Sequence, residues 1–299
     1  MNNLVGIVIL TYKNYSDTKE CLESILKSDY YPIQVWVVDN GSEDETIQLL
    51  VAEFPKIHTI QTGKNLGVAG GFNAGIIKAL DNGADYILIL NNDTVVEPDT
   101  IKILVSESQN HPDYGILMPK ILYYDSPNCI WSIGARHRFF PPAIVMIGLN
   151  QKDGPEYSKP RFLDYAPTCA LLIPKQVFEK VGLLDESYFL FYDDWDYSLR
   201  VRASGFKIAY IPQARVYHKV SKTIKNMRKA SSFWYLWGCS AGYFYRRHGR
   251  PPLLSALVHL SYLALREGLH NGPTVVFHFI AGAVKGYFKP ISPYKYLSK

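Results

Sequence analysis

The sequence predicts an α/β protein with a largely parallel central sheet, followed by a basic helical region towards the C-terminus. Three observations lead to this prediction. Short apolar runs alternate with segments of helical periodicity up to about residue 122. Polar residues directly follow several of these runs, as ligand-binding residues do at the carboxyl ends of parallel strands. Residues 220–299 are rich in aromatic, aliphatic and basic side chains.

The first part of the chain is expected to alternate between strands and helices. The apolar run at 5–10 predicts a buried strand, and 16–28 predicts a helix capped by Ser16 or Asp17. Alternation of this kind implies right-handed crossovers between parallel strands. Further strands are predicted at 34–39, 57–61, 86–91 and 115–122, and further helices at 44–54, 72–82 and 98–109.

The pattern weakens at 123–164, a segment with five prolines, where we expect a loop or hairpin insertion of the kind that shapes a specificity pocket. We therefore expect one domain over 1–219, with halves at 1–122 and 123–219, and a helical region over 220–299. Beyond the insertion the sequence predicts a strand at 168–174, a helix at 175–181, a helix ending near 204, and a strand at 207–212.

Composition argues against several classes of protein. Hydrophobic residues make up 47% of the chain and charged residues 20%, which is typical of a globular protein. The four cysteines form no C-x-x-C motif, so neither a structural zinc site nor a disulfide framework is expected. We expect reduced thiols, as in a cytosolic protein. The N-terminal segment lacks a basic start, and its apolar run ends at Thr11, which predicts a strand and not a signal peptide.

Charge is distributed unevenly along the chain. Residues 215–299 hold 14 lysines and arginines and one acid, Glu267, whereas residues 1–214 are net acidic. A basic tail on an acidic body indicates an anionic partner. The acidic body argues against nucleic acid as that partner.

The glycine-rich segment 63–75, GKNLGVAGGFNAG, does not fit a nucleotide-binding fingerprint. It lacks the i, i+2, i+5 glycine spacing after the first strand, and Gly63-Lys64 is followed by Asn65 where a Walker A loop needs Ser or Thr. Its five glycines, with Asn65 and Asn73, would let the backbone approach a ligand closely, and a helix start would suit phosphate. A flexible loop that starts a helix is the alternative.

Two aspartates stand at the ends of apolar strands. Asp93 ends the segment ILNND, and a turn at this point would explain an aspartate. Alternatively, Asp93 can bind Mg²⁺ or Mn²⁺, because these ions prefer carboxylate and phosphate oxygens. Asp39 ends VWVVD, where it can cap the next helix or accept a hydrogen bond from a nucleobase.

The segment LFYDDWDYSLR at 190–200 places Asp193, Asp194 and Asp196 among aromatic residues. A helix N-terminus stabilises each nearby carboxylate by about 0.3–1 kcal/mol. A purely structural role at the start of a helix therefore explains one or two aspartates more readily than three. A carboxylate in an aromatic pocket can serve as a general base, and a nearby dication would offset the repulsion. His218 ends a later apolar run and suits a metal or phosphate partner, although a lone histidine is more often structural.

In this order, the motifs resemble those of an inverting family 2 glycosyltransferase of the GT-A fold, in particular its rhamnosyltransferase-like branch. The resemblance covers residues 4–219. Six segments carry it: ILTYKN (9–14), VVDNGSED (37–44), NLGVAGGFNAG (65–75), LNNDTVV (90–96), GLLDESYFLFYDDWDYSLRVRASGF (182–206) and IPQARVYHK (211–219).

The resemblance implies a site for a dTDP- or UDP-linked sugar in the half formed by 1–122. Three of the matching positions hold the nucleobase and ribose, three lie along the nucleotide sugar, and two lie at the diphosphate. The positions for the nucleobase and ribose are Thr11, Tyr12 and Asp39. Those along the nucleotide sugar are Asn65, Gly70 and Asn73, and those at the diphosphate are Asn92 and Asp93.

The resemblance also implies a divalent metal, Mg²⁺ or Mn²⁺. Asp93 matches the final aspartate of the DxD motif, which holds the cation on the diphosphate. His218 matches a histidine that completes the metal or diphosphate site in some relatives. Asn91 stands where the first aspartate of the motif often stands, which leaves fewer charges for the metal.

The half formed by 123–219 is implied to hold the acceptor. Asp194 matches the base of the family's ED pair, with Asp193 in place of the usual Glu, and it would take the proton of an attacking hydroxyl. Tyr192 and Trp195 would stack on sugar faces and exclude water. No Q-x-x-R-W motif follows, so a processive synthase of the cellulose type is not expected.

Residues 220–299 are expected to form basic amphipathic helices. The apolar stretches 253–265 and 274–284 are shorter than the roughly 20 residues that a membrane span needs. These stretches can pack as core helices against the catalytic domain, or they can lie on an anionic membrane surface. The positive charge beside aromatic side chains favours helices that bind the membrane surface. A polyprenyl-diphosphate-linked acceptor at the cytoplasmic face of the cell membrane would account for both features.

The sequence therefore predicts a metal-dependent inverting glycosyltransferase of surface polysaccharide synthesis, with dTDP-rhamnose as the leading donor and a glycan or lipid-linked acceptor. UDP-galactofuranose, UDP-glucose and other donors stay open. A nucleotidyltransferase would need a basic glycine-rich signature after the first strand, which TYKNYSD lacks. A non-catalytic sugar-binding module is the other rival, and formation of a homo-oligomer also stays open.

Overall fold

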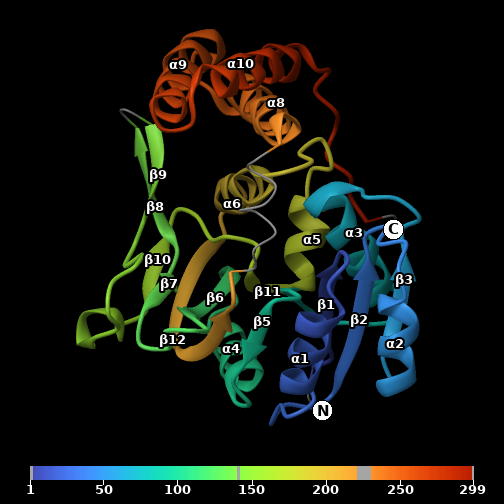
Figure 1. Cartoon of the computed structure of the whole chain (residues 1–299). Coiled ribbons are helices and arrows are strands. Elements are labelled where there is room, and N and C mark those ends of the chain that lie inside the picture. The colour runs from blue at the N-terminus through green and yellow to red at the C-terminus, as the bar shows by residue number, and fades with distance from the viewer. Residues whose placement is uncertain (1–2, 140–141, 221–229, 298–299) are drawn as a thin grey trace.

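In the part of the chain that the structure describes, a mixed ten-stranded sheet forms the body of the protein (Figure 1). The structure is a computed structural model that describes residues 3–139, 142–220 and 230–297. The strand order is β10-β12-β6-β11-β4-β1-β2-β3, with β5 paired to β12 and β7 to β6. The strands are β1 (Val5–Thr11), β2 (Ile33–Asp39), β3 (His58–Gln61), β4 (Tyr86–Asn91), β5 (Thr94–Val96), β6 (Tyr114–Tyr123), β7 (Ile130–Ser132), β10 (Arg161–Leu163), β11 (Ala170–Pro174) and β12 (Lys207–His218).

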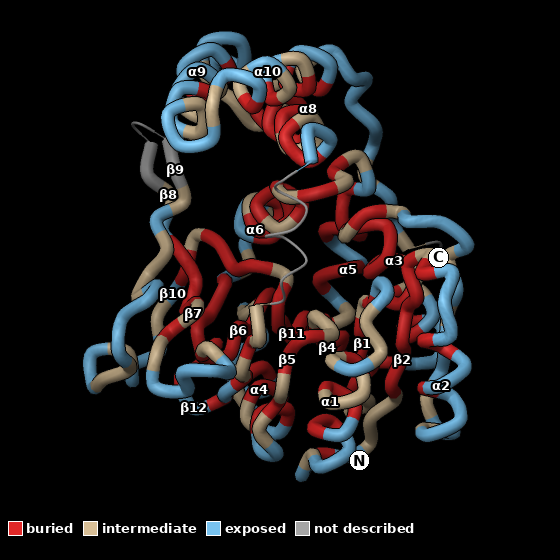
Figure 2. Tube along the Cα trace, in the orientation of Figure 1, coloured by how far each residue is buried: buried red, intermediate tan, exposed pale blue. Residues whose placement is uncertain are grey.

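The predicted parallel sheet is confirmed in its N-terminal half. Strands β3, β2, β1 and β4 are parallel, whereas β11 enters antiparallel between β4 and β6. Strand β1 is apolar along its length and almost fully buried, because α1 and α3 both pack on it (Figure 2). The helices of this body are α1 (Tyr15–Ile25), α2 (Thr46–Glu53), α3 (Gly67–Asp81), α4 (Thr100–Asn110), α5 (Lys175–Val181), α6 (Asp193–Ala203) and the short 3₁₀ helix η1 (Pro155–Tyr157).

Three predicted boundaries were wrong. Helix α1 is capped by Asn14, whose side chain accepts a hydrogen bond from the Asp17 amide, and not by Ser16 or Asp17. Helix α3 begins at Gly67, five residues before the predicted start. Strand β12 continues to His218 instead of ending at 212. Its pairing with β6 shifts register between Ile211 and Arg215, and this irregularity accommodates Pro212 within the strand.

The insertion at 123–164 contains a hairpin, one of the two structures expected for it. Strands β8 (Ala135–Phe139) and β9 (Pro142–Met146) pair with each other and not with the main sheet. The hairpin extends towards the C-terminal helices (Figure 1). Ile144 and Met146 pack in the same apolar cluster as Ala256 and Ala264, so the insertion and the C-terminal region form one wall.

The C-terminal region consists of α8 (Ser231–His248), α9 (Pro252–Asn271) and α10 (Pro273–Phe288), which lie above α6 in Figure 1. Phe244 of α8 shares a core cluster with Tyr192 and Trp195 beside α6, so this helix belongs to the folded body. Residues 221–229, which carry four of the region's basic side chains, lie outside the described residues. No helix within the described ranges is long and apolar enough to cross a membrane.

Helices α8 and α10 touch through glycine. A methyl group added at Gly242 would overlap the Ala283 carbonyl oxygen, and one at Gly286 would overlap the Cys239 carbonyl oxygen. Glycine is therefore required for the backbones to approach this closely. Such small-residue contacts between helices are typical of helix packing in membranes.

Candidate active site

The carboxyl ends of neighbouring strands bring the predicted donor-side residues together. Thr11 at the end of β1 pairs in register with Asp39 at the end of β2, and β4 lies parallel on the other side of β1. The Asn92 side chain donates to the Thr18 hydroxyl at 3.0 Å, and that hydroxyl hydrogen-bonds to Thr11 at 2.8 Å. The expected convergence of polar strand ends is therefore present.

Asp39 and Tyr12 differ in their exposure. The Asp39 carboxylate is buried and accepts hydrogen bonds from the amide and the hydroxyl of Ser42, the amide at 3.0 Å. It therefore stabilises the turn after β2 and does not cap the next helix, because the N-cap residue of α2 is Glu45. The Tyr12 ring is 42% exposed, so it is available to a ligand at this edge of the sheet.

Asn65 belongs to the same cluster of strand ends. Its side-chain oxygen accepts hydrogen bonds from the Gly67 amide at 2.9 Å and from the Asn40 side chain at 3.2 Å. Asn40 directly follows Asp39 at the end of β2. Asn65 therefore ties the start of α3 to the end of that strand.

Gly70 and Asn73 lie inside α3 and make contacts within the protein. The Asn73 side chain accepts from the Leu184 amide at 3.1 Å and donates to the Leu184 carbonyl at 2.9 Å. A methyl group at Gly70 would press on the Leu66 side chain. Asn73 therefore holds the segment before α6, a role that the sequence did not reveal, and its predicted contact with the nucleotide sugar remains a prediction.

The predicted metal residues Asp93 and His218 are in contact. Strand β12 pairs with β5 so that His218 lies opposite Thr94, the residue after Asp93. The two side chains are buried, and His218 Nε2 lies 3.1 Å from Asp93 Oδ1. The edge of the Trp131 ring packs on His218 and restricts its orientation.

Carboxylate oxygen and imidazole nitrogen are donors that Mn²⁺ and Mg²⁺ accept, so Asp93 and His218 fit a divalent cation. Burial lowers the pKa of His218, but Cys169 and Asp93 beside it raise that pKa to about 10 in the metal-free protein. A bound metal would displace this proton. Among the described residues no group of three or more His, Cys, Asp or Glu side chains could hold a metal ion, so diphosphate and water would complete its coordination.

The aspartate cluster begins α6, and the backbone before it is unusual. Phe191 and Tyr192 both have positive φ values, 62° and 68°, which are uncommon for bulky residues and concentrate at functional sites. This turn leads directly into Asp193 and Asp194 at the start of the helix. The Tyr192 and Trp195 rings then stack at 5.8 Å with an interplanar angle of 13°.

Asp194 has the surroundings of a general base. Burial raises its pKa to about 6, even though hydrogen bonds from the Tyr165 hydroxyl and the Trp195 amide lower it in part. The Tyr165 hydroxyl donates to Asp194 Oδ2 at 2.5 Å, and the Trp195 amide donates to Oδ1 at 2.9 Å. A base with a pKa near 6 is ionised at neutral pH and still basic enough to accept a proton.

The other two aspartates have different surroundings. Asp193 is almost fully buried, and burial together with the Asp194 charge raises its pKa well above the usual range. It does not line the pocket beside Asp194, although it was expected on the acceptor side. Burial alone would raise the pKa of Asp196, but His248 and Arg200 outweigh it and lower that pKa. Within the cluster the pKa of Asp193 is therefore raised, whereas the ion-pair partners of Asp196 lower its pKa and offset its charge.

Consecutive residues connect the base to the metal pair. The Thr168 amide lowers the pKa of Asp194, and Cys169 lies against His218 and Asp93. Neighbouring Cα atoms are about 3.8 Å apart. Asp194 and the Asp93–His218 pair therefore both lie close to the short segment before β11.

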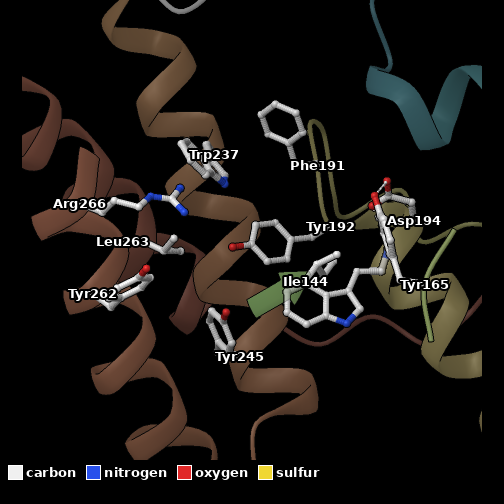
Figure 3. Close-up of a pocket in the computed structure, with 11 residues that line it drawn as sticks. Ile144, Tyr165, Phe191, Tyr192, Asp194, Trp237, Tyr245, Tyr262, Leu263 and Arg266 are labelled. Carbon is white, nitrogen blue, oxygen red and sulfur yellow. Dashed lines mark hydrogen bonds between the residues drawn. The ribbon is translucent and has the colours of Figure 1, made fainter. Parts of the chain in front are cut away.

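A pocket of about 340 Å³ opens beside Asp194 (Figure 3). Tyr192 and Trp195 line it, as the sequence suggested for an acceptor site. Tyr165 and Arg266 had no recognisable signal in the sequence, because they lie 29 residues before and 72 after Asp194 and belong to no motif. The lining residues are Ile144, Tyr165, Phe191, Tyr192, Asp194, Trp195, Trp237, Tyr245, Tyr262, Leu263 and Arg266.

Comparison with known proteins gives relatives that act on sugars. The sequence matches the family described as "Glycosyl transferase family 2" over residues 6–180. The N-acetylglucosaminyl-diphospho-decaprenol L-rhamnosyltransferase of Mycobacterium tuberculosis is 27% identical over 241 residues, which are 73% of this chain and 76% of the relative. The dTDP-rhamnosyl transferase RfbF of Shigella flexneri is 28% identical over 228 residues, 75% of this chain and 72% of the relative.

Solved structures share the fold. The mannosyltransferase PcManGT from Pyrobaculum calidifontis, crystallised with GDP-Man and Mn²⁺, aligns with a TM-score of 0.57 at 15% identity, over 95% of this chain and 87% of its own. Residues 1–349 of S. aureus TarS align with a TM-score of 0.56 at 15% identity, over 89% and 72%. The sheet is thus a GT-A fold, as predicted. Because the family match spans more than half of the chain, including the strand ends that gather Thr11, Asp39 and Asp93, this protein belongs to glycosyl transferase family 2 and is a glycosyltransferase.

Proposed function

We propose that this glycosyltransferase moves rhamnose from dTDP-rhamnose to a hydroxyl of a glycan or lipid-linked acceptor, with inversion at C1, in surface polysaccharide synthesis. The observation that carries the reaction type is Asp194, a carboxylate with a pKa of about 6 at one end of an aromatic pocket. The names of the relatives from Mycobacterium tuberculosis and Shigella flexneri support rhamnose. UDP-galactofuranose and UDP-glucose are the alternative donors.

In the proposed mechanism Asp194 takes the proton of the acceptor hydroxyl as that oxygen bonds to C1 of the donor sugar. Tyr165 holds the carboxylate in place through Oδ2. The rings of Tyr192 and Trp195 stack on the acceptor and exclude water. The nucleotide diphosphate leaves from the opposite face of the sugar, on the side of the strand ends.

The donor side is assigned to the strand-end cluster. Thr11, Tyr12 and Asp39 hold the base and ribose, Asn65 with Gly70 and Asn73 lines the nucleotide sugar, and Asn92 and Asp93 lie at the diphosphate. Asp93 and His218 would hold Mg²⁺ or Mn²⁺. When bound, this cation neutralises charge that develops on the leaving diphosphate.

A thermal-shift screen with Mn²⁺ tests the donor. A ligand at 100 times its Kd stabilises the folded protein by about 2.7 kcal/mol, because it binds only that form. We expect dTDP-rhamnose to raise the melting temperature more than UDP-galactofuranose, UDP-glucose or GDP-mannose. A larger rise with a UDP-linked sugar would overturn the rhamnose assignment while leaving the transferase in place.

Activity is expected to depend on the ionisation of Asp194. The raised pKa of about 6 means that the base is protonated below that pH, so kcat/KM should fall about tenfold per pH unit below 6 and level off above it. In Tyr165→Phe the midpoint should move upwards, because the Tyr165 hydrogen bond lowers the pKa. A profile that is flat down to pH 5, or an unmoved midpoint in Tyr165→Phe, would contradict the assignment.

The same pKa has a consequence for stability. The folded protein binds the Asp194 proton more tightly than the unfolded chain, whose carboxyl titrates near 3.8. This group alone therefore makes the protein less stable as the pH rises from about 4 to 6. Activity profiles should consequently be measured together with unfolding curves at each pH.

We also propose that the C-terminal region binds the cytoplasmic face of an anionic membrane. Helix α9 points small residues such as Ala256 and Ala264 inwards and exposes five of its seven leucines, which is unlike a water-soluble surface helix. Helix α10 adds an exposed stripe that includes Phe277 and Phe288. The exposed leucines of α9 are Leu253, Leu254, Leu257, Leu265 and Leu269, which are 56–77% exposed.

Vesicle flotation tests the membrane proposal. Full-length protein should float with phosphatidylglycerol vesicles, and the double variant Leu257→Gln/Leu265→Gln should bind about tenfold more weakly or worse, because burying a leucine is worth up to about 1.5–3 kcal/mol. The control is Leu26→Gln/Leu49→Gln, which changes two exposed leucines, one at the C-cap of α1 and one on α2. If wild type stays in solution as a dimer that only the first variant dissociates, the leucines pair between copies and the membrane proposal fails.

A further inference from the structure

The pocket beside Asp194 has opposite charges at its two ends. Asp194 and Tyr165 lie at one end, and Arg266 of α9 reaches in from the other, with the Tyr192 ring between them (Figure 3). Arg266 is the basic residue among those that line the pocket. The proposed acceptor site is therefore built jointly by the catalytic domain and the C-terminal region.

The Arg266 guanidinium can take a ligand. Its Nε and Nη2 atoms donate to Glu267, the next residue, at 2.8 and 2.5 Å, and the Arg266 side chain is 44% exposed. The Glu267 side chain is only 14% exposed, and it occupies the Nε and Nη2 side of the guanidinium. Within the described ranges Nη1 has no hydrogen-bond partner. A guanidinium offers five N–H donors in a planar fork that matches a phosphate.

The order of chemical groups along the pocket fits one class of acceptor. A hydroxyl belongs at Asp194, a sugar ring belongs against Tyr192 and Trp195, and an anion belongs at Arg266. Next to Arg266 on the same helix, Leu265 and Leu269 are exposed. A sugar joined through phosphate to a prenyl chain has this sequence of hydroxyl, ring, anion and hydrocarbon, whereas a neutral glycan would offer no anion to Arg266 and leave Glu267 as its ion-pair partner.

We infer that Arg266 binds the phosphate attached to the accepting sugar and so selects a prenyl-diphosphate-linked acceptor over a neutral glycan. The inference rests on the proposed function, because Asp194 must be the base that marks the hydroxyl end of the pocket. It assigns an acceptor-binding role to the C-terminal region in addition to its proposed role at the membrane.

Arg266→Gln tests the inference with two soluble probes. One is N-acetylglucosamine linked through diphosphate to farnesol, and the other is farnesyl N-acetylglucosaminide, which lacks the diphosphate. We expect Arg266→Gln to raise the KM for the diphosphate probe about tenfold or more, because hydrogen bonds to charged groups are lost. The kcat, the donor KM and the KM for the neutral probe should stay within about twofold.

Arg250→Gln is the matched control, since it removes the same charge from an exposed arginine just before α9 that does not line the pocket. It should behave as wild type with both probes. An unchanged KM in Arg266→Gln, or an equal rise with both probes, would overturn the inference. So would a parallel loss of binding to anionic vesicles in Arg266→Gln but not in Arg250→Gln, because the anion would then be a lipid headgroup.

Direct binding separates failure of the inference from failure of the proposed function. Trp195 and Trp237 line the pocket, so quenching of tryptophan fluorescence reports the Kd of each probe without turnover. Tighter binding of the diphosphate probe that disappears in Arg266→Gln supports the inference even if no sugar is transferred. Transfer to both probes with equal Kd values in wild type and Arg266→Gln would leave the transferase intact and refute the inference.

Discussion

Asp194→Asn is expected to lower kcat by about 10²–10⁴-fold, the usual contribution of a general base. Asparagine keeps the size of the side chain, and its one carbonyl oxygen can still accept from the Trp195 amide, which donates to Oδ1 in the structure. Its NH₂ group would then face the Tyr165 hydroxyl, which donates to Oδ2 of Asp194 and would have to accept a hydrogen bond instead. Asparagine cannot take a proton from the acceptor hydroxyl. Donor binding should survive, because the side-chain hydrogen bonds of Asp194 go to Tyr165 and Trp195 and not to the strand-end residues.

Single-turnover kinetics and donor titration measure the two parts of this expectation. The control is Asp81→Asn, the same substitution at an exposed carboxylate at the end of α3. It should retain wild-type kcat. Normal turnover in Asp194→Asn would remove the base from the proposed mechanism. An equal loss of nucleotide binding would instead show that the substitution disturbs the donor side, and the role of Asp194 would have to be revised.

The strand-end residues could be predicted because a parallel sheet repeats a simple rule. An apolar run followed by Thr11, Asp39 or Asn91 fixes both the strand and the edge at which its polar end lies. Their pairing in the sheet follows from the alternation of strands and helices. The contact between Asp93 and His218 could not be predicted from this rule alone. It depends on β12, which extends six residues beyond its predicted end at 212.

The glycine-rich segment shows where local patterns mislead. Its glycines suggested a ligand-binding loop that ends near residue 72, but helix α3 starts at Gly67. A glycine is needed at position 75 for another reason, because a side chain there would collide with Val8 of β1. Close packing of a helix on a sheet and close approach of a ligand both favour glycine. Only the three-dimensional structure separates the two causes.

The pocket could be predicted only in part, because its walls come from distant segments. The aromatic residues next to Asp194 were evident from the sequence. Tyr165 and Arg266 reach the same space through the insertion and through α9, and no spacing rule connects them to the aspartates. Of the alternatives considered for the C-terminal region, packing on the catalytic domain is seen for α8, whereas membrane binding by the exposed leucines of α9 stays a proposal.

Asp196 joins the catalytic helix to the C-terminal region. It is fully buried, and it accepts hydrogen bonds from Arg200 at 2.7 Å, from His248 at the end of α8 at 2.7 Å, and from the Tyr294 hydroxyl at 3.2 Å. The Tyr294 ring contacts the guanidinium groups of both Arg200 and Arg247. One carboxylate thus connects three segments that are far apart in the sequence.

Asp196→Ala is expected to destabilise the protein by about 3–5 kcal/mol, because it leaves the buried Arg200 without its counter-ion. Urea unfolding at pH 7 measures this loss. The matched control is Glu179→Ala, which breaks another i,i+4 pair, with Lys175, that is exposed and therefore worth at most about 0.5 kcal/mol.

The loss in Asp196→Ala should also depend on pH in a defined direction. Burial raises the pKa of Asp196, but His248 and Arg200 outweigh it, so the folded-state pKa lies below the ordinary value of 3.8. The stabilisation is therefore complete above about pH 4 and is lost as the pH falls through the folded-state pKa. The difference between wild type and Asp196→Ala should shrink in acid. A difference below about 1 kcal/mol at pH 7, or one no larger than in Glu179→Ala, would mean that α6 does not depend on this carboxylate to hold the C-terminal region in place.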